Sequence, residues 1–154
     1  MATRSFIITP TGDSLFRGIY CHWDGYPEGV GATLAEHYTD EDKIDRLVKL
    51  GSISSLGSRV EPTNGGTHSF AAPEEGTTVA YHRDRGEDLN IAEGCTLDEI
   101  LAAARESWCE YAYIRDTAAS GGWRVVDLHA EETAAPVVTP ALALVAPESV
   151  PESV

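Results

Sequence analysis

The chain has 154 residues, 42% of them hydrophobic, and a formal net charge of −14 at pH 7. This length and hydrophobic fraction predict one globular domain with its own core and argue against a wholly disordered chain. The acidic excess repels phosphate backbones, so we expect no general nucleic-acid binding. The same charge fits a partner protein with a basic face, although in most acidic proteins it only maintains solubility.

The cysteines and the N-terminal residues indicate an intracellular protein. The cysteines are widely spaced and form no CxxC pair, a pattern typical of reduced thiols rather than of a disulfide-stapled secreted domain: Cys21, Cys95 and Cys109. The N-terminus has no apolar run of signal-peptide length, and no segment is apolar over enough residues to span a membrane. We therefore expect a cytoplasmic protein that does not engage a membrane.

The first third of the chain predicts a hairpin followed by two helices. Two runs of β-forming side chains flank a Pro-Thr-Gly-Asp turn, which predicts an antiparallel hairpin over residues 4–21. Gly18 in the second strand indicates a bulge or a close backbone approach. Apolar residues at helical spacing predict a half-buried helix over 27–38 and a second helix over 39–50. A very short turn joins these helices, so we expect them to pack as a pair against the sheet.

The rest of the chain predicts a loop, a strand, a third helix and a second hairpin. A long loop is expected over residues 52–77, followed by a strand over 77–82 and a charged turn. The capping box Thr96–Glu99 predicts the start of a helix that runs to about Trp108 and directs this side chain into the core. Alternation of apolar and polar side chains predicts a hairpin over 111–128, with its aromatic residues in the core or paired across the strands.

In order, these elements predict an α+β domain over residues 1–130. Its sheet is expected to be mainly antiparallel, built from the two hairpins in the order ββαα(β)αββ, and covered by helices. Residues 131–154 are rich in Pro and Ala and end in a repeated Pro-Glu-Ser-Val sequence. Proline blocks helix and sheet, and no periodic apolar face is present, so we expect an acidic, disordered C-terminal tail.

A dense group of aromatic and polar residues between the second strand and the first helix is the strongest candidate for a functional site. It reads Tyr20-Cys21-His22-Trp23-Asp24-Gly25-Tyr26-Pro27. Tyr and Trp supply rigid apolar area with polar tips, a composition typical of interface hot spots and ligand pockets. Core packing explains each aromatic residue equally well, but His22 and Asp24 alternate with them and need water or partners. We expect a binding site made of Tyr20, His22, Trp23, Asp24 and Tyr26, with Arg83, Asp84 and Arg85 beside it.

Three kinds of chemistry have suitable residues in this stretch but an unsuitable arrangement. Cys21 and His22 are adjacent, so they point to opposite faces of a strand, and no CxxC or HxxxH pair completes a zinc site. The glycines of 25–31 lack the GK[ST] ending of a P-loop, and Asp24 and Glu28 occupy the place of the phosphate. A Cys/His/Asp set alone does not establish the geometry that activates a thiolate. We therefore expect no metal, no cofactor and no catalytic residue; a small hydrolase or transferase that uses Cys21 or His22 is the alternative.

The same stretch resembles a signature of small proteins encoded by bacteriophages and prophages. The resemblance rests on Tyr20–Pro27 with Gly29-Val30-Gly31, on residues 80–87 and on the predicted second hairpin, and it covers about residues 4–128. It implies a phage accessory protein in the host cytoplasm with no defined reaction, of a class that often interferes with host machinery or host defence. We therefore expect a protein that binds and inhibits a host or host-defence factor. The alternative ligand is a small nucleotide-like molecule stacked on Trp23 or a tyrosine.

Overall fold

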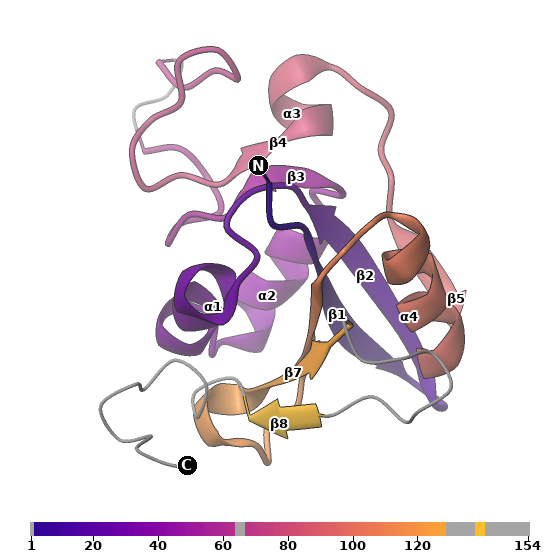
Figure 1. Ribbon diagram of the computed structural model, residues 1–154. Helices are drawn as coiled ribbons and strands as arrows, with labels where there is room; N and C mark the ends of the chain where they lie inside the picture. The colour runs from indigo at the N-terminus through magenta and orange to yellow at the C-terminus, as the bar shows by residue number, and fades with distance from the viewer. Residues whose placement is uncertain (1, 64–66, 129–137, 141–154) are drawn as a thin grey trace.

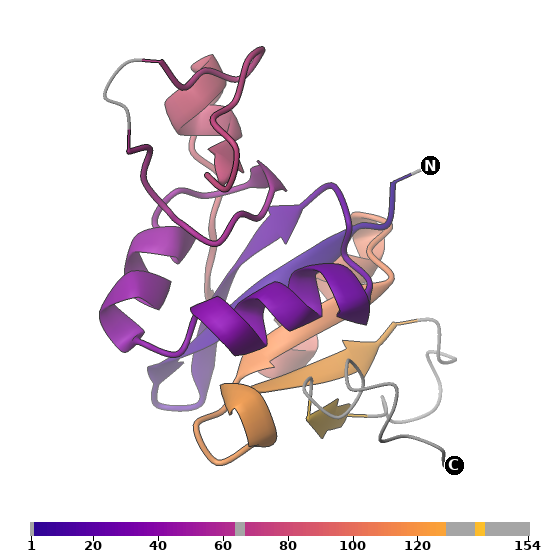
Figure 2. The same ribbon diagram turned by 90° about the vertical axis from the view of Figure 1, so that its left-hand side faces the viewer.

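The computed structural model describes residues 2–63, 67–128 and 138–140, which form a mixed β-sheet with helices on both faces (Figures 1 and 2). The main strand order is β4-β3-β2-β1-β6-β7-β8, and β5 pairs with β2 outside this path. The strands are β1 (Ser5–Gly12), β2 (Leu15–Cys21), β3 (Ile53–Ser55), β4 (Val79–Ala80), β5 (Ala92–Cys95), β6 (Tyr111–Arg115), β7 (Trp123–Asp127) and β8 (Val138–Pro140). The helices are the π-helical turn η1 (Pro27–Gly31), α1 (Ala32–His37), α2 (Glu41–Val48), α3 (Tyr81–Arg85), α4 (Leu97–Glu106) and the 3₁₀ turn η2 (Ser120–Gly122).

The predicted α+β class is confirmed, but the sheet is mixed rather than assembled from antiparallel hairpins alone. Both predicted hairpins are present, as the antiparallel pairs β1–β2 and β6–β7. They are joined through a parallel pair between β1 and β6, and β2 pairs in parallel with β3. Parallel neighbours need a crossover and come from segments far apart in the chain, so local alternation and turn residues carry no signal for them.

The first hairpin shows how its sequence fixes its geometry. Asp13 and Ser14 form its two-residue loop, with φ of 55° and 64°. Two successive residues at positive φ give the turn twist that suits right-handed strands. A Cβ atom at Gly18 would lie 3.0 Å from Ile100 Cδ1 of α4, so the close approach predicted at this glycine is confirmed. Glycine at this position allows α4 to pack directly on β2.

Successive side chains of the central strands supply two cores on opposite sides of the sheet. Ile7, Tyr113 and Trp123 face η1, α1 and α2, which lie together on one side (Figure 1). Ile8 and Ile100 belong to the core under α4 on the other side. The predicted core positions of Tyr113 and Trp123 are confirmed, since both are 0% exposed. The period of two in the strands therefore produces a three-layer arrangement, helix–sheet–helix.

The two predicted helices on the first side are confirmed. The first begins at Pro27 with the π-helical turn η1 and continues without a break into α1. In the second, the Asp40 side chain accepts a hydrogen bond of 3.0 Å from the backbone N–H of Lys43 and so caps α2. The apolar stripe predicted for α2 is buried against the sheet: Ile44, Leu47 and Val48.

The strand predicted over 77–82 is shorter than expected, because the chain turns into a helix at Tyr81. Only Val79 and Ala80 pair as β4, and α3 follows directly. The Asp84 carboxylate accepts the backbone N–H of Ala80 at 2.8 Å, which closes the first turn of α3. The charged turn expected after the strand is thus this helix, which lies with β4 at the end of the sheet beyond β3 (Figures 1 and 2).

Most of the tail predicted over 131–154 lies outside the described residues. The exception is Val138–Pro140, which pairs antiparallel with β7 as strand β8. A helix needs about 20 apolar residues to cross the hydrocarbon core of a bilayer. None of the helices in the described ranges has the length and apolar character to do so.

Trp108 is the main departure from the predicted core. It was expected to face inward at the end of α4, but it is 77% exposed and has a φ of 66°. It follows the C-cap Ser107, and the next N–H, of Cys109, donates to the carbonyl of Ala104 at 3.0 Å. This is the arrangement in which helices commonly end on a left-handed glycine. The left-handed backbone turns the indole away from the helical stripe, so the prediction that Trp108 lies in the core is wrong.

Replacing Trp108 by glycine should stabilise the fold. A non-glycine residue in the left-handed region costs on the order of 1 kcal/mol, and glycine removes this cost. We expect Trp108→Gly to raise the free energy of unfolding by about 1 kcal/mol, measured by urea denaturation followed by circular dichroism. Trp108→Ala is the control, because it removes the indole but keeps the strained backbone. A glycine variant less stable than the alanine variant would contradict this account.

Candidate functional site

The backbone that carries the predicted binding residues is fixed on several sides. As the chain leaves β2, the N–H groups of His22 and Trp23 donate to carbonyls of β3 at 3.1 and 3.0 Å. The next turn is fixed at Gly25, whose N–H donates to Thr3 at 2.8 Å and whose carbonyl accepts the buried Tyr113 hydroxyl at 2.7 Å. A Cβ at Gly25 would lie 2.7 Å from the Thr3 carbonyl oxygen, so only glycine fits this close approach.

The side chains of Tyr20, His22, Trp23, Asp24 and Tyr26, here called the aromatic surface, form two connected groups on this backbone. The Tyr20 hydroxyl lies 2.8 Å from His22 Nδ1, and the His22 ring packs edge-on against Trp23 with 4.7 Å between ring centroids. The Tyr26 hydroxyl donates to Asp24 Oδ1 at 3.0 Å. Tyr20 and His22 are half-buried, Asp24 is exposed, and Trp23 and Tyr26 are 44% and 40% exposed.

The charges around this surface make its exposed end acidic, and Arg4 adds a positive charge near its inner end. The hydrogen bond to Asp24, followed by the charges of Asp24 and Glu28, raises the pKa of Tyr26. Burial, together with the positive charge of Arg4, lowers the pKa of His22. The two exposed carboxylates therefore define the electrostatic character of the outer rim.

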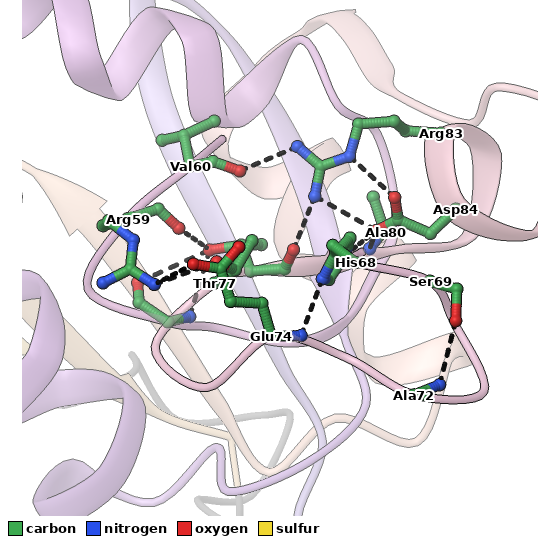
Figure 3. Close-up of polar contacts among 12 residues, drawn as sticks. Arg59, Val60, His68, Ser69, Ala72, Glu74, Thr77, Ala80, Arg83 and Asp84 are labelled. Atoms are coloured by element: carbon green, nitrogen blue, oxygen red, sulfur yellow. Dashed lines mark hydrogen bonds and ion pairs between the residues drawn. The ribbon is translucent and has the colours of Figure 1, made fainter. Parts of the chain in front are cut away.

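Arg83 and Asp84, predicted to lie beside the aromatic surface, are instead engaged in a buried network (Figure 3). The Arg83 guanidinium donates to the carbonyls of Val60 and Thr78 at 2.7 and 2.6 Å and to Asp84 at 2.9 Å. The Asp84 side chain is 6% exposed and also accepts from Ala80. These contacts join the long loop to β4 and α3, so the two side chains stabilise the fold and offer little surface to a ligand.

His68 completes this network and was not recognised in the sequence. Its side chain is 2% exposed, and its Nε2 lies 3.0 Å from Asp84 Oδ2. Its Nδ1 accepts the backbone N–H of Glu74 at 3.0 Å, which places the ring proton on Nε2. Both ring nitrogens are occupied, so His68 is not placed to act as a general base. It lies in a loop without periodicity, which is why no local pattern identified it.

Arg85 was predicted, with Arg83 and Asp84, to lie beside the aromatic surface. Its side chain lies on the protein surface. It forms an ion pair with Glu87, and its guanidinium lies 4.3 Å from the Phe70 ring centroid and 5.2 Å from that of Tyr81. These cation–π contacts cover the loop residue Phe70. Arg85 thus holds the loop against α3.

The thiols near the candidate site are poorly placed for catalysis. Cys21 is 0% exposed, and burial raises its pKa to about 12. Burial also raises the pKa of Cys109 to about 12. A nucleophilic cysteine needs an accessible thiolate, so these observations argue against a hydrolase or transferase that uses Cys21. Across the described ranges, His, Cys, Asp and Glu side chains form no group of three that could hold a metal ion.

A cavity of about 510 Å³ has Tyr20 of the aromatic surface in its wall. The other polar or aromatic groups of the wall come from the N-terminal segment, β1, the loops before β3 and β5, and the end of α4: Arg4, Phe6, Ser52, Asn90, Ser107 and Trp108. Because these groups come from distant parts of the chain, no sequence motif marks the cavity.

The buried network predicts a specific dependence of stability on pH. Burial raises the pKa of Asp84, but hydrogen bonds from Arg83, Ala80 and His68 outweigh this effect and lower it to about 2. Because folding lowers this pKa, the ionised carboxylate stabilises the folded protein at pH values above the unfolded-state pKa. This stabilisation is lost as the pH falls towards the folded-state pKa. We expect Asp84→Asn to lower the free energy of unfolding at neutral pH by about 2 kcal/mol.

Urea denaturation at a series of pH values between about 5 and 2 measures this contribution. The wild type should lose stability more steeply over this range than Asp84→Asn. Asp88→Asn, at an exposed carboxylate on the following loop, is the matched control and should follow the wild type. Equal pH profiles for the wild type and Asp84→Asn would contradict the role given to the network.

The accessibility of the thiols predicts their order of alkylation. Cys95 is partly exposed, whereas Cys21 and Cys109 are buried with raised pKa values. We expect iodoacetamide to modify Cys95 in the folded protein and the other two only in denaturant, as measured by peptide mass spectrometry. Rapid modification of Cys21 in the folded protein would restore the case for a nucleophilic thiol.

Comparison with known proteins identifies no relative, so the evidence for a function comes from the side chains described above. The resemblance of the Tyr20–Gly31 stretch to phage-encoded proteins stays a prediction. No protein-family model, curated protein or solved structure matches the chain.

Proposed function

We propose that this chain is a phage accessory protein that acts in the host cytoplasm by binding and inhibiting a host or host-defence protein. The observation that carries the proposal is the exposure of Trp23 and Tyr26, at 44% and 40%, on a backbone fixed by β3 and by Gly25. Large aromatic side chains held in place on a surface are typical of interface hot spots, because little conformational freedom is lost on binding. The phage origin rests on the resemblance of the stretch that contains them.

The charge of the protein supports a partner with a basic face. Asp24 and Glu28 are exposed beside Trp23 and Tyr26, and the whole chain carries −14. Opposite charges around an interface accelerate the encounter and fix its orientation. The proposed contact therefore combines aromatic anchors with an acidic rim.

The two alternatives have less support at this surface. Catalysis by Cys21 is disfavoured by its burial, and His22 Nδ1 is engaged with the Tyr20 hydroxyl. A small nucleotide-like ligand stacked on Trp23 would lie on an open face, since the cavity wall includes Tyr20 and not Trp23. A large partner that covers the exposed aromatic side chains suits this geometry better.

Matched affinity captures from a lysate of a bacterial host test the proposal. Immobilised wild type, Trp23→Ala and Leu89→Ala are compared by quantitative mass spectrometry; Leu89 is an exposed leucine on another loop and serves as the control. We expect a host protein to be retained by the wild type and by Leu89→Ala, and to fall at least about tenfold with Trp23→Ala.

The ionic strength of the same capture tests the role of charge. Screening shortens the reach of exposed charges, so retention should decrease as salt is raised from about 50 mM to about 300 mM. Equal retention by Trp23→Ala and wild type, or the absence of any host protein that distinguishes them, would refute the proposed contact.

A further inference from the structure

We propose that the cavity between α4, β5 and the sheet binds a small aromatic anion of about the size of a nucleoside monophosphate. This inference does not depend on the proposed partner protein: the cavity shares Tyr20 with the aromatic surface, but the ligand contacts are assigned to Arg4 and Trp108, which lie outside that surface. The cavity volume of about 510 Å³ lies in the range of small-molecule sites. Small residues form part of its wall, among them Gly18 and Ala103.

Arg4 gives the cavity a positive charge that no carboxylate in the described part of the chain pairs with. Most of the basic side chains form ion pairs with carboxylates, as Arg83 does with Asp84 and Arg124 with Asp116. Within residues 2–63, 67–128 and 138–140, Arg4 belongs to none of these ion pairs. The planar donors of such a guanidinium match a phosphate or carboxylate group of a ligand.

Arg4 lies close to Tyr20 in the wall of the cavity. Burial raises the pKa of Tyr20, while the positive charge of the nearby Arg4 guanidinium opposes this rise. Both side chains line the cavity. The hydroxyls of Ser52 and Ser107 and the amide of Asn90 line it too, and they can donate hydrogen bonds to an oxygen-rich ligand.

Trp108 supplies a flat apolar wall that folding does not explain. Its indole is 77% exposed, so core packing does not require it, and its φ of 66° favours glycine at this position. A large aromatic residue that is both exposed and strained, at the rim of a cavity, is the kind of outlier found at ligand sites. Its ring face can stack on a planar ring of the ligand.

Trp108 and Arg4 would each make one contact with the ligand, and the two contacts can be tested separately. A planar ring stacks on Trp108, and an anionic group on the same molecule reaches Arg4. A neutral ring makes only the first contact, and an anion without a ring makes only the second. A nucleoside monophosphate makes both.

Isothermal titration calorimetry with three probes tests this arrangement in the full-length protein. Adenosine 5′-monophosphate carries ring and anion, adenosine only the ring, and ribose 5-phosphate only the anion. We expect the monophosphate to bind, and each of the other two to bind at least about tenfold more weakly, as expected for the loss of one charged or stacking contact.

Two variants separate the two contacts. Arg4→Gln should weaken binding of the monophosphate at least tenfold and leave that of adenosine unchanged. Trp108→Gly should weaken both ligands that carry a ring, even though we expect this variant to unfold at higher urea than the wild type. Trp108→Phe, which keeps an aromatic face, should restore part of the affinity. Arg124→Gln is the control for a lost arginine, since Arg124 pairs with Asp116 and does not line the cavity.

The outcomes distinguish the cavity ligand from the proposed protein contact. No binding of the monophosphate at millimolar concentration, or equal affinity of the wild type, Arg4→Gln and Trp108→Gly, would overturn the cavity proposal. Neither result would affect the capture of a host protein by Trp23. Conversely, a failed capture with intact monophosphate binding would refute only the protein contact.

Discussion

The structure depends on the double pairing of β1, which is hydrogen-bonded antiparallel to β2 on one side and parallel to β6 on the other. This position buries its side chains on both faces, and Ile7 and Ile8 are 0% exposed. One face completes the core under η1, α1 and α2, and the other completes the core under α4. Both candidate sites depend on the same strand arrangement, since the aromatic surface continues from β2 and the cavity lies over β1 and β2.

Local signals in the sequence predicted the elements that local contacts determine. The two hairpins, the helix that begins at Pro27, the helix predicted over 39–50 and the capping box of Thr96 and Glu99 are all present. The parallel pairs and β5 were missed, because their partners are distant in the chain and the polar residues of β5 show no alternation. Trp108 was misplaced because helical spacing was extended past the residue where the backbone turns left-handed.

The same distinction between local and tertiary contacts applies to the residues predicted to form the binding site. The stretch from Tyr20 to Tyr26 is contiguous, so its composition marked it, and the structure leaves Trp23 and Tyr26 on the surface. Arg83 and Asp84 have the composition of site residues, but a buried loop histidine and backbone carbonyls engage them, and no sequence pattern reveals such partners. The cavity is a product of tertiary structure alone.

The anchoring of Gly25 has a consequence for how fast a partner can associate. The Tyr113 hydroxyl reaches from the central strand to the Gly25 carbonyl, while the Gly25 N–H is held by Thr3. The turn that presents Trp23 and Tyr26 therefore keeps one shape before any encounter. Association with a rigid surface does not wait for a rearrangement, so the rate of complex formation is governed by diffusion and electrostatic steering.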